Sequence, residues 1–130
     1  MHLESMLKKF SQEIDLETIP LENNNGEYQI TIGNAPSFIM KEMHPGFSLQ
    51  CAILKIPTVE PKENLFTYLL KANLNYQGTG EFVLGINQLE THITLSKKID
   101  YDVGYIQLYE LIEEFMNYVD YWSVNLSQFT

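Results

Sequence analysis

The sequence predicts an α+β fold in which three helices and five strands follow in the order helix, three strands, helix, two strands, helix. Two observations support this prediction. Apolar residues recur every three or four positions in three segments, as on one face of a helix, and alternate along the segments between them, as in a strand. Clusters of Gly, Pro and Asn separate the two kinds of segment, and these residues favour turns.

The stretch around residues 65–99 shows the change of period most clearly. Residues 65–72 carry apolar side chains on one face of a short helix, and the glycines Gly78 and Gly80 then interrupt the pattern. Residues 82–86 and 91–99 alternate as strands on either side of a turn. We therefore expect a helix followed by a β-hairpin.

The flanking segments complete the order of elements. Residues 2–17 form an amphipathic helix that ends before Pro20, and residues 27–32, 37–43 and 47–56 alternate as three strands. The far end of the third strand is apolar on both sides, which is typical of a strand buried on both faces. Asp102 precedes a long apolar stripe through Leu126, so we expect it to cap the N-terminus of a last helix.

Length and composition limit the possible functions. The chain has 130 residues, of which 45% are hydrophobic, so we expect one domain over residues 1–130 with a single core. Its net charge is −9, and all 8 basic residues are lysines. Nucleic acid is therefore excluded as a partner, because phosphate binding needs a positive field, and an anionic membrane surface is disfavoured for the same reason.

The lone cysteine, Cys51, permits no intramolecular disulfide, which suits a reducing cytoplasm. The sequence shows neither a signal peptide nor an apolar run of the roughly 18 to 20 residues that a membrane helix needs. We expect a soluble protein that is not exported and does not insert into membranes.

No catalytic or metal-binding motif is evident. His2, His44 and His92 lack the paired spacing of zinc ligands, and the glycines near residue 80 precede a strand, whereas a phosphate loop would open a helix. Glu113 and Glu114 are adjacent on the last helix, where neighbouring side chains point about 100° apart. These observations favour a binding protein over an enzyme.

Four short motifs carry a resemblance to a known family. They are Leu69-Leu70-x-x-Asn73-Leu74, Gly80-x-x-x-Leu84-Gly85-Ile86, Ile93-x-Leu95 and Tyr121-Trp122-x-x-x-Leu126. With the size, acidity and order of elements, they resemble the class I chaperones of bacterial type III secretion. The resemblance covers nearly the whole chain and is strongest from Leu65 to Leu126. The chain departs from the family at Asn87, where an acid is common, and at residues 98–100, where a Leu-Pro-Leu-like link is usual.

The resemblance implies a homodimer in the bacterial cytoplasm, with a twisted antiparallel five-stranded sheet flanked by three helices in each subunit. Its task would be to hold the N-terminal segment of a secreted effector in extended form, soluble and ready for secretion, without a cofactor, nucleotide or metal. A secretion ATPase or sorting platform is a further implied partner. By resemblance, the client-binding residues are Leu3, Leu7, Phe10, Ile30, Ile32, Phe38 and Met40, and the dimer interface is formed by Leu65, Phe66, Leu69, Phe82, Leu84 and Ile86.

Two other functions remain open at this point. One is a regulatory interaction module of the same fold, which would dimerise without binding an effector. The other is a small-molecule-binding or hydrolytic α+β domain that uses Cys51 or His92. For each apolar residue named above, an ordinary place in the core is the alternative to a contact with a partner.

Overall fold

The computed structural model describes residues 3–16, 20–56, 63–75 and 82–129, and it contains the expected elements in the expected order. The helices are α1 (Leu3–Glu13), α2 (Glu63–Asn75) and α3 (Tyr105–Leu126). The strands are β1 (Glu27–Ile30), β2 (Phe38–Glu42), β3 (Phe47–Lys55), β4 (Val83–Ile86) and β5 (His92–Ile99), and a short 3-10 turn, Ser127–Phe129, follows α3.

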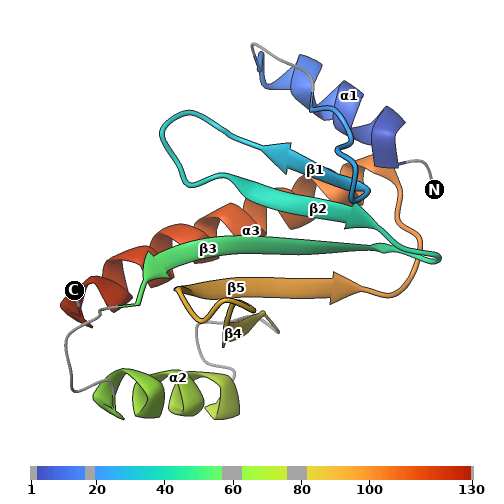
Figure 1. The fold of residues 1–130 in the computed structure, drawn as a ribbon. Helices are drawn as coiled ribbons and strands as arrows, with labels where there is room; N and C mark the ends of the chain where they lie inside the picture. Colours follow the sequence, from blue (N-terminus) through green and yellow to red (C-terminus); the bar gives the residue numbers. More distant parts are fainter. Residues whose placement is uncertain (1–2, 17–19, 57–62, 76–81, 130) are drawn as a thin grey trace.

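The five strands form one antiparallel sheet in the order β1-β2-β3-β5-β4. The central strand β3 sets the register, since Leu49 lies opposite Met40 of β2 and opposite Lys97 of β5. Figure 1 shows α3 crossing one face of the sheet, with α1 at the β1 end and α2 at the β4 end. The two outer strands, β1 and β4, are therefore the edges of the sheet.

The core lies between α3 and the sheet. One stripe of α3 is buried because its apolar residues recur every three or four positions, and it includes Leu108, Ile112 and Phe115. Phe115 meets Phe38 of β2 in an edge-to-face contact with 5.6 Å between the ring centroids. The other face of the sheet carries exposed polar residues such as Lys41 and Gln50, as is common for an antiparallel sheet.

The prediction that Asp102 caps the N-terminus of the last helix was wrong. The cap residue is Gly104, which makes no side-chain cap hydrogen bond. Asp102 instead accepts a hydrogen bond from the backbone N–H of Gly46, 3.2 Å away. The β2–β3 turn approaches so closely here that a Cβ on Gly46 would lie 1.7 Å from the carbonyl oxygen of Ile99. Asp102 thus closes a contact between distant segments, which local sequence could not reveal.

The far end of β3 also differs from the prediction of burial on both faces. The register shifts between Ala52, which pairs with Thr94, and Leu54, which pairs with Ile93. Such a bulge lets an extra residue into one strand, so alternation breaks at this point. Ala52 is exposed, and Ile53 and Leu54 are only half-buried. The strand is therefore buried mainly on its α3 side.

Candidate functional site

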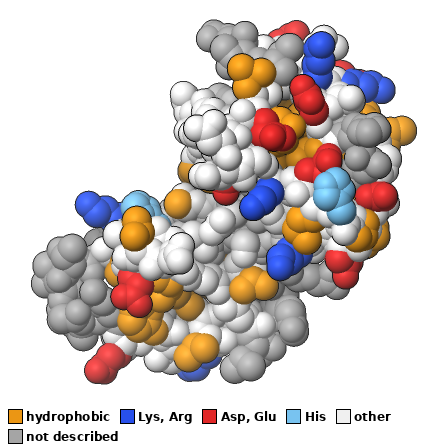
Figure 2. Space-filling model, turned by 45° about the vertical axis from the view of Figure 1, so that its right-hand side comes forward, with side chains coloured by type: hydrophobic (Ala, Val, Ile, Leu, Met, Phe, Trp, Pro, Cys, Tyr) orange, Lys and Arg blue, Asp and Glu red, His pale blue; other side chains and the backbone are white. Residues whose placement is uncertain are grey.

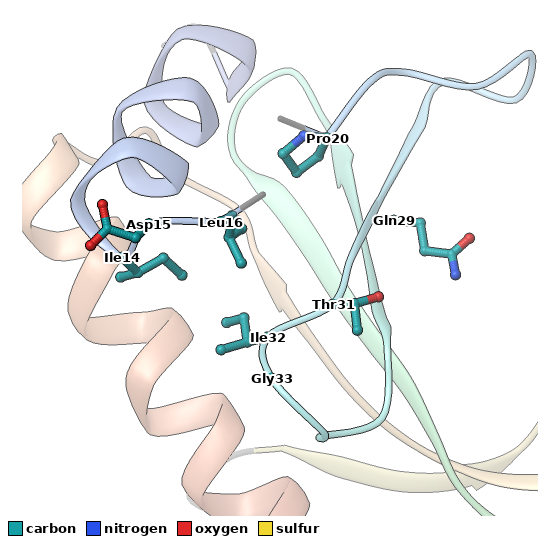
Figure 3. A pocket seen from close by; sticks show the side chains of 8 residues that line it. All are labelled: Ile14, Asp15, Leu16, Pro20, Gln29, Thr31, Ile32 and Gly33. Carbon is teal, nitrogen blue, oxygen red and sulfur yellow. The ribbon is translucent and has the colours of Figure 1, made fainter. Parts of the chain in front are cut away.

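A hollow of about 520 Å³ lies where the chain leaves α1 and passes the end of β1. Figure 3 shows the side chains of Ile14, Leu16 and Ile32 close to one another on one side of it, while Gln29 points away from them. Ile14 and Leu16 are held there because Leu16 N–H donates to Ser11 O at 2.9 Å and Ile14 N–H donates to Phe10 O at 3.1 Å. The wall on this side is therefore apolar and fixed by backbone hydrogen bonds.

A second, mainly apolar hollow of about 210 Å³ shares Ile14 and Ile32 with the first and continues toward α3. We treat the two adjoining hollows as one groove between the end of α1, the start of the β1–β2 connection and α3. We refer to it as the α1/α3 groove. Its apolar lining consists of Phe10, Ile14, Leu16, Pro20, Ile32, Tyr109, Ile112 and Met116, and its polar lining includes Asp15, Gln29, Thr31, Glu113 and Asn117.

Aromatic contacts hold the two walls of the α1/α3 groove together. Phe10 of α1 and Tyr109 of α3 meet edge to face with 5.5 Å between their ring centroids. Lys9 Nζ lies 4.4 Å from the ring centroid of Tyr105, whose hydroxyl donates to Glu13 Oε2 at 2.8 Å. Burial, followed by this hydrogen bond to Glu13, raises the pKa of Tyr105 to about 12. These contacts between α1 and α3 all lie within one subunit, so the groove does not need a second subunit to form.

The outer edge of β1 borders the groove. Its first half is covered, because Glu22 bridges to Tyr28 and Asn23 N–H donates to Glu27 O at 2.9 Å. Farther along, Gln29 and Thr31 line the first hollow. An extended chain in the groove would therefore lie beside a sheet edge, where main-chain hydrogen bonds and alternate side chains can both be used.

The structure places most of the predicted client-binding residues inside the subunit. Leu3, Leu7, Phe10, Ile30, Phe38 and Met40 are each at most 4% exposed. Ile32 is half-buried and lines both hollows, and Phe10 lines the second. Sequence reasoning missed Ile14, Leu16, Tyr109, Ile112 and Met116 as groove residues, although all but Leu16 belong to the helical stripes of the first and last helices.

The predicted dimer residues also divide into two groups. Leu65, Leu69, Phe82 and Leu84 are at most 6% exposed, whereas Phe66 is 37% and Ile86 42% exposed. Leu70 on α2 and Val83 on β4 are exposed as well. We refer to Phe66, Leu70, Val83 and Ile86 as the α2/β4 surface. Figure 2 shows hydrophobic side chains gathered at the end of the molecule where these two elements lie.

Two possibilities considered from the sequence, a metal site and a reactive Cys51, find no support among the described residues. Within the described residues, no group of three or more His, Cys, Asp or Glu side chains is placed to hold a metal ion. Cys51 is 1% exposed, and burial raises the pKa of its thiol to about 11, so the reactive thiolate is disfavoured at neutral pH. Among the helices that the structure describes, none is long and apolar enough to cross a membrane.

The comparison with protein families decides the identification. The model of the Tir chaperone protein (CesT) family matches residues 5–123, which is nearly the whole chain. The chain belongs to the Tir chaperone protein (CesT) family. The resemblance to class I type III secretion chaperones is thereby confirmed. A search of curated proteins finds no match.

Three solved structures show the same fold. The first is described as the crystal structure of the ExsC-ExsE complex, with a TM-score of 0.75, 15% identity and 95% of each chain covered. The second is the HopA1-SchA chaperone-effector complex, with a TM-score of 0.66, 15% identity and coverage of 92% of this chain and 91% of that one. The third is the heterodimeric ExoU-SpcU complex from the type III secretion system of Pseudomonas aeruginosa, with a TM-score of 0.62, 13% identity and coverage of 89% and 90%. The predicted α+β fold is confirmed, and the family and fold are those of type III secretion chaperones.

Proposed function

We propose that this chaperone binds the N-terminal segment of a secreted effector in extended form and keeps it soluble and competent for secretion. The observation that carries the proposal is the α1/α3 groove, which lies beside the edge of β1 and has an apolar wall that includes Ile14 and Ile32. Among structures of the same fold, one is described as a chaperone-effector complex, which supports an effector as the client.

The chemistry of the groove suits an extended apolar segment. Successive side chains of a strand point to opposite sides, so every second client residue would enter the groove while its neighbours stay in solvent. Each client Leu, Ile, Val or Phe that becomes buried contributes roughly 1.5 to 3 kcal/mol before the cost of ordering the segment. Because apolar burial dominates, binding should weaken only slightly as salt is raised.

The chaperone would act as a homodimer whose two subunits associate through the α2/β4 surface. Phe66, Leu70 and Ile86 leave apolar side chains in solvent at one end of the sheet, and a second copy would cover them. The four buried residues predicted for this interface would support it from beneath. The dimer would work in the bacterial cytoplasm. It would deliver the bound effector to a secretion ATPase or sorting platform.

Co-purification from the native cell tests the proposed client. A tagged chaperone should retain one or more secreted proteins, and an N-terminal fragment of such a protein should suffice for binding. The gene next to that of the chaperone is the first candidate to examine. Recovery of a transcriptional regulator in place of a secreted protein would support the regulatory module, and recovery of no specific protein would contradict the effector proposal.

A further inference from the structure

The side chain of Asn73, near the end of α2, forms two hydrogen bonds to one residue of the edge strand β4. Its Nδ2 donates to the carbonyl oxygen of Leu84 at 2.7 Å, and its Oδ1 accepts from the Leu84 N–H at 2.9 Å. A primary amide offers a donor and an acceptor side by side, as a neighbouring strand does. Asn73 therefore occupies the place of a paired residue on the outer side of β4.

This contact matters because Leu84 lies in the strand at one edge of the sheet. β4 has four residues and pairs with β5 on one side only, at the end of the sheet. In an antiparallel pair the main-chain groups of alternate residues point to opposite sides, so those of Phe82, Leu84 and Ile86 point outward. Asn73 fills the middle one of these three positions, and an incoming strand cannot pair across it.

We infer that Asn73 determines which edge of the sheet accepts a strand: it closes β4 to main-chain pairing and leaves the second half of β1 for an extended client. An edge strand with unpaired main-chain groups recruits other chains, and proteins block such edges in various ways. A second copy would then meet α2 and β4 through side chains, without continuing the sheet. The statements about the client and the second copy rest on the proposed function, whereas the closure of β4 does not.

The effect of Asn73 on β4 is tested by hydrogen exchange. In Asn73→Ala the Leu84 amide loses its acceptor, so its exchange should become at least tenfold faster than in the wild type. The matched control is Asn64→Ala on the same helix, because Asn64 is exposed and makes no side-chain hydrogen bond within the described part of the chain. Unchanged protection of Leu84 in Asn73→Ala would overturn the inference.

A peptide probe tests whether the edge has been opened. A labelled peptide with the sequence of residues 91–99 contains β5, which pairs with the inner side of β4 in the folded protein and serves here as a strand-forming probe of its outer side. It should bind Asn73→Ala at least tenfold more tightly than the wild type or Asn64→Ala. Equal binding to all three proteins, or binding to none, would overturn the blocking role. Neither test uses a client, so failure of the effector proposal would leave these results interpretable.

A second variant covers the case in which Asn73→Ala does not fold, as judged by circular dichroism. Asn73→Asp keeps an acceptor for the Leu84 N–H but replaces the donor to Leu84 O with a carboxylate oxygen. Because the carboxylate oxygen repels Leu84 O, the Asp side chain should leave the edge, so the Leu84 amide should exchange faster and the peptide should bind more tightly than to the wild type. Peptide binding equal to that of the wild type would contradict the inference.

Discussion

Phe10 of α1 packs edge to face against Tyr109 of α3, with an interplanar angle of 62° and 5.5 Å between the ring centroids. The two residues lie 99 positions apart in the chain, and their contact holds the two walls of the α1/α3 groove together. The same aromatic pair therefore stabilises the subunit and shapes the proposed binding site.

Removing this contact should destabilise the fold. Phe10 is only 4% exposed, so Phe10→Ala should lower the free energy of unfolding by roughly 3 to 5 kcal/mol, the range for truncating a buried Phe. Tyr101→Ala is the control, because Tyr101 is 49% exposed and should cost at most about 1 kcal/mol. Urea denaturation of both variants measures the difference. Equal losses would mean that α1 is not firmly packed on α3.

The proposed dimer should depend on exposed residues of the α2/β4 surface. Ile86→Asp places a charge in the apolar contact and should shift light scattering toward the monomer mass. Ile106→Asp makes the same chemical change on α3, where the side chain is 75% exposed, and should leave the mass unchanged. Substituting the buried Leu69 or Leu84 would be less informative, because the subunit itself would unfold. A wild-type protein that is monomeric at micromolar concentration would contradict the dimer.

Stability should fall in alkaline solution partly through Tyr105. Its pKa is raised to about 12 in the folded protein, above the ordinary value of 10.0, so the folded state holds this proton more tightly than the unfolded state. The stabilisation is complete below about pH 10 and is lost as pH rises from 10 toward 12. Tyr105→Phe should therefore show a shallower loss of stability over this interval, measured by urea midpoints at several pH values. A Tyr105→Phe variant that loses stability as steeply as the wild type over this interval would contradict the prediction.

The sequence predicted the elements of this fold well because their periods are local properties. The stripe of α3, for example, could be read from spacing alone. Spacing could not tell what each apolar residue faces, since Leu3 and Ile14 belong to the same helical stripe, yet Leu3 is buried in the core and Ile14 lines the groove. Asp102 shows the same limit, because its partner Gly46 lies 56 residues away. The groove joins distant segments and required the three-dimensional arrangement.

The absence of ligand motifs in the sequence leads to a prediction about cofactors. A ligand that binds the folded state stabilises it by mass action and raises its melting temperature. Because the sequence shows no motif for zinc, magnesium or ATP, we expect none of the three to change the melting temperature. Differential scanning fluorimetry at ligand concentrations up to the millimolar range is sufficient. A clear upward shift with any of the three would favour a catalytic or nucleotide-dependent function.

Comparing Ile32→Ala with Met40→Ala in both stability and client binding shows whether the client lies in the α1/α3 groove. Ile32 is half-buried in the groove, so its truncation should change the free energy of unfolding by only about 1 kcal/mol and weaken binding of the effector segment at least tenfold, or about 1.4 kcal/mol. Met40 is fully buried, so its truncation should cost roughly 2 to 5 kcal/mol of stability, while the molecules that remain folded bind normally. Denaturation curves and titrations of a labelled effector segment give both quantities. Normal binding by a folded Ile32→Ala variant would show that the client does not lie in the α1/α3 groove.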